Sequence, residues 1–220
     1  MKKIIILLSF FCFYANAQDN EMKPIFNKKN LNGWNTFLPS KGINADPDSV
    51  FAVQNGILHI SGEEFGYIAT KDTFRDFYLI AEFKWGEAKY PPRENEKRDS
   101  GILYFVPLDV PEKIWPKSVE YQIQEGDVGD FWLIDSATIQ VNGKRTVPAD
   151  YLRVEKKRDN EYPNGEWNTV EIISRDGELT HKVNDKVVNR GSSPNITEGR
   201  ILIQSEGAEI YYRKIEIKRL

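Results

Sequence analysis

The chain has 220 residues, of which 40% are hydrophobic and 12% aromatic, and its formal net charge is −3. This length and apolar content suffice for one domain with a packed core, and the acidic balance argues against nucleic acid as a partner. With two histidines, one cysteine and no glycine-rich phosphate loop, the sequence excludes most zinc, thiol and nucleotide chemistry. Carboxylates must therefore carry any catalysis.

The first 17 residues have the three parts of an export signal. Lys2 and Lys3 precede an apolar run over residues 4–14, and residues 15–17 read Ala-Asn-Ala, a small-x-small cleavage pattern. The apolar run is much shorter than the ~20 residues that cross a bilayer. We therefore expect cleavage before Gln18 and a protein exported to the periplasm or the extracellular space, without membrane insertion.

Cleavage would also remove the only cysteine, Cys12, so the mature chain could form no disulfide. Without the two lysines the basic count falls from 30 to 28 against 33 acidic residues, a formal net charge of −5. A lipid anchor on Cys12 is the alternative interpretation. It would need a small residue before the cysteine, where Phe10 and Phe11 stand.

After a short tail over residues 18–23, the pattern predicts one all-β domain over residues 24–220. Short β-rich runs alternate with turn dipeptides such as Asn55-Gly56, and no convincing helix of four turns is found. The clearest run, residues 77–85, alternates between one apolar face and one wetter face. Further strands are expected at residues 102–106, 119–124, 167–174, 178–183, 186–189, 200–204 and 210–217.

Two other features of the domain can be predicted. Residues 24–26 and 215–217 are the candidates for pairing the first strand with the last. Residues 86–99 contain two prolines and many charges, which predicts an exposed loop.

The most specific local pattern is the alternation of Glu120, Gln122 and Gln124 on one side of a predicted strand. Three polar groups in a row suggest the floor of a cleft. The spacing is similar to the Glu-x-Asp-x-x-Glu strand of laminarinase-type β-glucanases, but Gln122 replaces the central acid. The alternative is that these residues simply form the solvated face of an antiparallel sheet.

The segment after this strand, residues 126–132, joins glycine–aspartate pairs to aromatic residues. Aromatic rings stack on sugars, and carboxylates accept hydrogen bonds from hydroxyl groups. The candidates for these contacts are Asp127, Asp130, Trp132, Trp115 and Tyr104. His181, which precedes a predicted hairpin turn, is a further candidate because histidine titrates near neutrality.

Residues 46–48 and 206–209 carry oxygen ligands that calcium could use, but turn chemistry explains both segments more simply. No metal and no cofactor are predicted.

Taken in order, several motifs make the chain resemble the 3-keto-disaccharide hydrolase family over residues 24–220. The motifs are residues 25–27 with 31–34, then 98–104, 115–127, 129–132, 165–168, 181–184 and 204–209. The resemblance implies a concanavalin A-like jelly roll, a sandwich of two curved antiparallel sheets that binds sugar in its concave face. It also implies a substrate whose glucose unit is oxidised at carbon 3 and is cleaved by elimination and hydration.

That chemistry needs a base, an acid and a group that stabilises an enolate. We expect Glu120 to be the base or acid, with Gln122 orienting hydroxyl groups and His181 among the groups that stabilise negative charge. The residues expected to contact substrate are Arg98, Asp99, Tyr104, Trp115, Lys117, Glu125, Asp127, Asp130, Trp132 and Glu82.

Two departures from the family pattern stand out. Phe105 occupies a position where many relatives carry histidine; if that histidine takes part in the chemistry of the relatives, this member uses another group or has lost activity. Asp185 replaces a common glycine, which should alter only a turn.

Two alternative functions remain open at this stage. One is a non-catalytic, lectin-like carbohydrate-binding sandwich. The other is an ordinary β-glucanase that uses Glu120 and Glu125, although Gln122 argues against it. In each case the predicted partner is carbohydrate; the sequence makes no prediction of the oligomeric state.

Overall fold

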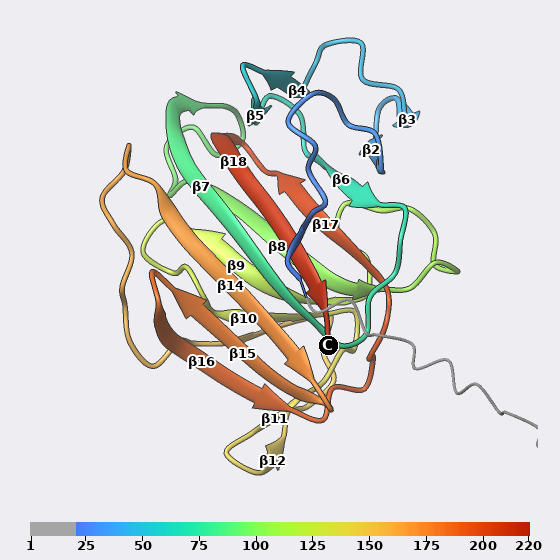
Figure 1. Ribbon diagram of the computed structural model, residues 1–220, viewed down its shortest axis with the longest axis vertical. Coiled ribbons are helices and arrows are strands. Elements are labelled where there is room, and N and C mark those ends of the chain that lie inside the picture. Colours follow the sequence, from blue (N-terminus) through green and yellow to red (C-terminus); the bar gives the residue numbers. More distant parts are fainter. Residues whose placement is uncertain (1–20) are drawn as a thin grey trace, which may run out of the picture.

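The computed structural model describes residues 21–220. The expected export signal at residues 1–17 and the start of the tail lie outside the described residues. Between residues 21 and 220 the chain forms strands and turns with no helix, and no segment there could cross a membrane as a helix. The fold is the predicted all-β jelly roll of two antiparallel sheets (Figure 1).

The larger sheet has the strand order β12-β11-β16-β15-β14-β7-β18-β5-β4, with β1 beside β18. Its strands are β1 (Lys23–Pro24), β4 (Phe51–Gln54), β5 (Ile57–Ile60), β7 (Phe77–Lys89), β11 (Gln140–Val141), β12 (Lys144–Arg145), β14 (Asn168–Arg175), β15 (Glu178–Val183), β16 (Lys186–Ser192) and β18 (Ala208–Arg219).

The smaller sheet has the order β13-β10-β9-β8-β17-β6-β2-β3. Its strands are β2 (Trp34–Leu38), β3 (Gly42–Ile43), β6 (Gly66–Thr70), β8 (Asp99–Val106), β9 (Ser118–Gln124), β10 (Phe131–Ile134), β13 (Tyr151–Val154) and β17 (Arg200–Ser205).

Strand alternation produces the main core between the sheets. In β7 every second residue from Phe77 to Trp85 is buried, as predicted, and the residues between them are partly exposed. The predicted pairing of the chain ends is also present, because Lys23 and Pro24 pair with Ile217 and Glu216. The predicted loop at 86–99 is shorter than expected, since β7 continues to Lys89 and β8 already begins at Asp99.

A β-bulge interrupts β8 at Tyr104 and Phe105. The register with β17 shifts so that these two residues oppose one, and Phe105 has a φ of 61°, a region that bulky residues rarely occupy. Both side chains are buried between the sheets, where Phe105 packs edge-on against Phe77. The side chain at position 105 therefore belongs to the core.

A second hydrophobic cluster lies apart from the main core, on the concave outer face of the smaller sheet. It consists of Tyr67, Ala69, Leu103, Val106, Ile134 and Leu202, with the partly buried Phe37, Val110, Trp115 and Trp132 packed against it. Val110 and Trp115 come from the loop over residues 107–117. Glu112 in this loop accepts hydrogen bonds from Tyr67 and from Arg200, so the loop is anchored over the sheet.

Candidate active site

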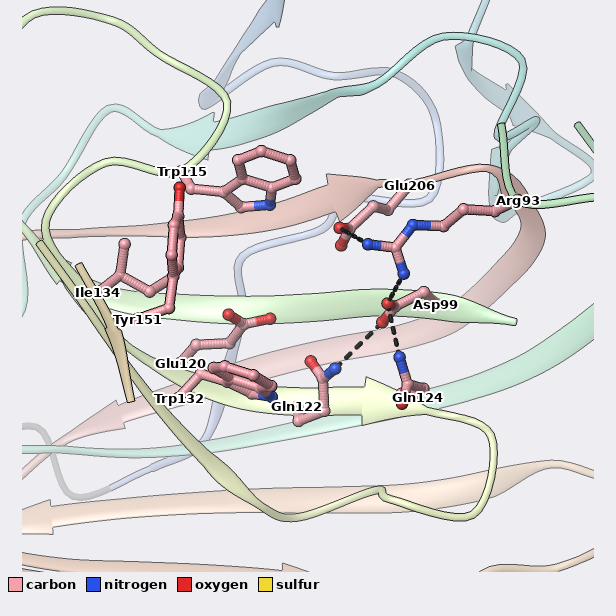
Figure 2. Close-up of a pocket in the computed structure, with 10 residues that line it drawn as sticks. All are labelled: Arg93, Asp99, Trp115, Glu120, Gln122, Gln124, Trp132, Ile134, Tyr151 and Glu206. Atoms are coloured by element: carbon pink, nitrogen blue, oxygen red, sulfur yellow. Dashed lines mark hydrogen bonds and ion pairs between the residues drawn. The ribbon is translucent and has the colours of Figure 1, made fainter. Parts of the chain in front are cut away.

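A cavity of about 390 Å³ opens on the concave face of the smaller sheet. Strands β8, β9, β10 and β13 contribute to its wall, together with the loops at 90–98 and 107–117 and the turn after β17. Figure 2 shows the lining residues, which are Arg93, Asp99, Trp115, Glu120, Gln122, Gln124, Trp132, Ile134, Tyr151 and Glu206.

Strand β9 supplies the floor. Its alternation places Glu120, Gln122 and Gln124 on the cavity side, whereas Tyr121 and Ile123 are fully buried in the main core. The three polar residues that share one face in the sequence thus line one cavity.

A charged network occupies one end of the cavity. Asp99 accepts hydrogen bonds from Gln122 Nε2 at 3.1 Å and Gln124 Nε2 at 2.7 Å, and a further one from the guanidinium group of Arg93. Arg93 also donates to Glu206 Oε1 at 2.9 Å. One arginine therefore holds two buried carboxylates from distant parts of the chain.

Glu120 lies beside this network with 5% of its surface exposed. Within the described part of the chain its carboxyl group has no hydrogen bond or ion pair. Burial raises the pKa of Glu120 well above its usual range, and the nearby Glu206 and Asp99 raise it further, while Arg93 offsets part of the effect. Both effects shift Glu120 toward its protonated form.

Burial also raises the pKa values of Asp99 and Glu206, and Arg93 opposes the rise in both. For Glu206, repulsion from Asp99 adds to the rise and a hydrogen bond with Trp115 reduces it. Three carboxyl groups thus lie around one guanidinium cation. Because each has different neighbours, their pKa values differ.

Gly101 makes room for the carboxyl group of Glu120. A Cβ atom at position 101 would lie 2.0 Å from Glu120 Oε1 and 2.3 Å from Gln204 Oε1, so both side chains occupy space that any other residue would fill. Gln204 is 1% exposed, and neither polar atom of its amide has a hydrogen-bond partner among the described residues. Leaving such atoms unpaired is costly, and they lie next to Glu120.

The other end of the cavity is aromatic and aliphatic. Trp115, Trp132, Ile134 and Tyr151 form this end in Figure 2. The rings of Trp115 and Tyr151 meet edge to face, with centroids 6.1 Å apart. Trp115 and Trp132, both predicted sugar contacts, lie here, whereas Asp99 lies in the charged end.

Two predicted site residues lie in the main core instead. His181 and Tyr104 are fully buried, and their side chains are hydrogen-bonded to each other at 3.1 Å. His181 Nδ1 is also 3.1 Å from the carbonyl oxygen of Gly129. Burial lowers the pKa of His181 to about 3, so the ring is neutral. The prediction that His181 stabilises negative charge on the substrate is therefore wrong. The prediction that Tyr104 contacts the substrate is wrong for the same reason, because its side chain lies in the core.

Four other predicted contacts do not line the cavity but form ion pairs elsewhere. Arg98 pairs with Glu125 at 3.3 Å, while Arg153 binds Asp127 at 2.9 Å and Asp130 at 2.6 Å. Glu125 does not share the face of Glu120 because β9 pairs with β8 and β10 without a bulge. A bulge would have been needed to return Glu125 to the face of Glu120, so the β-glucanase pairing of these two residues is not formed.

Lys117 and Glu82 are also absent from the cavity wall. Glu82 lies on β7 of the larger sheet and binds Arg213. Sequence reasoning missed Arg93, Ile134, Tyr151 and Glu206 as lining residues. Glu206 belongs to the family motif at residues 204–209 and Arg93 to the charged segment at residues 86–99. Neither position indicated that the side chain lines a cavity.

The segments considered for calcium use their oxygen atoms internally. Asp46 accepts backbone hydrogen bonds from Val50 and Phe51, and Glu209 binds the side chains of His59 and Tyr211. Over residues 21–220 no group of three or more histidine, cysteine or acidic residues is arranged to hold a metal ion.

Solved structures similar to this chain are sandwiches of the same kind. A "putative glycosyl hydrolase" from Parabacteroides distasonis is 21% identical, with a TM-score of 0.63 over 89% of this chain and 92% of that one. A second from the same organism is 23% identical, with a TM-score of 0.62 over 91% and 100%. The β-glucanase of Bacillus licheniformis is 9% identical, with a TM-score of 0.55 over 92% and 100%.

These likenesses establish the fold alone. A comparison with curated proteins finds no match. The model of one family, described as the 3-keto-alpha-glucoside-1,2-lyase-like domain, matches residues 21–218. Because the match covers nearly the whole chain, this protein belongs to the family of 3-keto-alpha-glucoside-1,2-lyase-like domains.

Proposed function

We propose that this protein cleaves the glycosidic bond of a 3-keto-disaccharide or 3-keto-glycoside by elimination followed by hydration, and that it does so outside the cytoplasm. The observation that carries the proposal is the cluster of Glu120, Asp99 and Glu206 around Arg93. It offers a protonated carboxyl group and a carboxylate in one sheltered cavity, which are the acid and base that the reaction needs.

A ketone at carbon 3 acidifies the proton on carbon 2. A base removes this proton, the bond from carbon 1 to the glycosidic oxygen breaks, and a double bond forms between carbons 1 and 2. The departing oxygen receives a proton from an acid. Water then adds across the double bond, with its hydroxyl group on carbon 1 and its proton on carbon 2, and the acid and base return to their first states.

The geometry favours Glu120 as the acid, because burial and its acidic neighbours keep it protonated. Glu206 is the candidate base, because its raised pKa makes its ionised form a stronger proton acceptor than Asp99. Asp99 already accepts hydrogen bonds from Arg93, Gln122 and Gln124, which hold it as a fixed anion that positions the guanidinium group. Arg93 supplies the positive charge that stabilises the enolate oxygen, the role that the sequence predicted for His181.

A non-catalytic carbohydrate-binding protein is the second candidate. The aromatic end of the cavity favours it, because Trp115, Trp132 and Tyr151 can hold one ring of a bound glycoside without any acid or base. The two functions differ in their need for Glu120: the enzyme needs it for turnover, whereas a carbohydrate-binding protein does not.

The test uses the mature chain, residues 18–220, with a 3-keto-glucoside and its unoxidised parent, and follows release of the leaving group. We expect release from the keto compound alone, and a loss of at least ~100-fold in kcat for Glu120→Gln with binding retained. Glu171→Gln is the matched control, because Glu171 is equally buried but lies on the larger sheet. Binding without release from either compound would favour the second candidate.

A further inference from the structure

The cavity is divided into two ends of different chemistry, with Glu120 between them. In Figure 2 the charged and amide side chains of Arg93, Asp99, Gln124 and Glu206 gather at one end. Tyr151 and Ile134 lie on the far side of Glu120 from them, and Trp115 and Trp132 lie above and below Glu120. A substrate that spans the cavity would therefore place one part in each end, with the bond that joins the parts near Glu120.

The charged end suits a sugar ring. Its guanidinium, carboxyl and amide groups offer donors and acceptors to several hydroxyl groups, and Gln122 Oε1 is buried without a hydrogen-bond partner among the described residues. Under the proposed function, the oxidised glucose unit lies here, where Arg93 can reach the oxygen on carbon 3.

The opposite end of the cavity offers fewer hydrogen-bond partners to the hydroxyl groups of a second sugar ring. Trp115, Trp132 and Ile134 belong to the hydrophobic cluster on the outer face of the sheet. Among residues 21–220 no charged or amide side chain lines this end. The hydroxyl groups of a sugar would therefore lose water there without equivalent replacement, which is unfavourable.

We propose that this end of the cavity is an aglycone site for a flat apolar group, such as an aromatic ring. The inference rests on the proposed function and narrows its substrate to a glucoside with an aryl leaving group, in place of a disaccharide. Aromatic rings prefer edge-to-face and offset neighbours, and Trp115 and Tyr151 already meet edge to face. The apolar end thus contributes affinity by burying the aglycone.

The experiment measures binding, so that it does not depend on turnover. Glu120→Gln protein is titrated by calorimetry with the 3-keto derivatives of phenyl glucoside, methyl glucoside and a glucosyl disaccharide, each in both anomeric forms. We expect the phenyl compound to bind at least ~10-fold more tightly than the other two in one anomeric form. Adding Tyr151→Ala should remove most of that advantage and change the affinity for the methyl compound less than ~2-fold.

Tyr162→Ala is the matched control, because Tyr162 is 49% exposed, close to the 54% of Tyr151, and does not line the cavity. It should leave all three affinities unchanged. The inference is overturned if the disaccharide binds as tightly as the phenyl compound, if Tyr151→Ala weakens both glucosides equally, or if none of the three binds. Failure of leaving-group release with selective phenyl binding intact would instead reject only the proposed cleavage.

Discussion

The fold buries the carboxyl group of Glu120 and favours its protonated form, which makes the folded protein less stable at alkaline pH. In the unfolded chain a glutamate loses its proton near pH 4.3, whereas burial and the acidic neighbours keep Glu120 protonated well above that pH in the folded chain. Between the two pKa values the folded state retains a proton that the unfolded state has lost. The free energy of unfolding therefore decreases as pH rises through this window.

Glu120→Gln should remove this dependence, because glutamine has a similar shape and does not ionise. We expect the variant to be more stable than the wild type by about 1–3 kcal/mol at pH 8, with almost no difference at pH 4. Urea unfolding followed by tryptophan fluorescence at both pH values measures the difference. A gain of the same size at both pH values would show that the pKa of Glu120 is not raised in the folded protein.

Individual side chains were the hardest part to predict from sequence. The alternation of Glu120, Gln122 and Gln124 was readable because it depends only on neighbouring residues in one strand. Arg93 and Glu206 were not, since they are 113 residues apart and meet only when β8 and β17 pair. His181 was misassigned because the type of residue says nothing about which face of a strand it takes.

At the scale of strands, the site depends on close packing between β8, β9 and β17. Gly101 on β8 is the point where this packing is tightest, because the side chains of Glu120 and Gln204 lie where its Cβ would be. The same strand carries the bulge at Tyr104 and Phe105, which turns both side chains toward the core. Phe105 in place of histidine therefore changes the core and leaves the cavity wall intact.

Gly101→Ala should displace the carboxyl group of Glu120 and lower kcat/KM for a 3-keto-glucoside by ~10–100-fold, because small misplacements of catalytic groups are costly. Steady-state kinetics, with circular dichroism as a check on folding, measure the effect. Gly191→Ala is the control. Its Cβ would also meet a side chain, that of Ile139 at 2.7 Å, but on the larger sheet, and it should leave kcat/KM unchanged. Equal losses in both variants would contradict the prediction.

The longer strands from Phe77 onward were predictable because their alternation and their turn dipeptides are both strong. Strand β10 and strand β13 were not singled out, since four residues give too short a pattern. Tyr151 reaches the cavity only through the pairing of these two strands, so its role could not be seen without the structure.

For the molecule as a whole, export remains a proposal that rests on residues 1–17. Expression of all 220 residues in a Gram-negative host should yield a periplasmic protein whose sequenced N-terminus is Gln18. A chain starting at residue 18 with a new initiator should stay in the cytoplasm. Recovery of intact Met1, or of a lipid on Cys12, would contradict this prediction.

The last strand of the described residues, β18, is not at an edge. It lies inside the larger sheet between β7 and β5 (Figure 1), and β1 pairs with it as well. A chain that lacks residues 208–219 would leave β7 and β5 without their shared neighbour, so the larger sheet is complete only when β18 has taken its place. Truncation before residue 208 would therefore open the interior of the larger sheet to proteolysis.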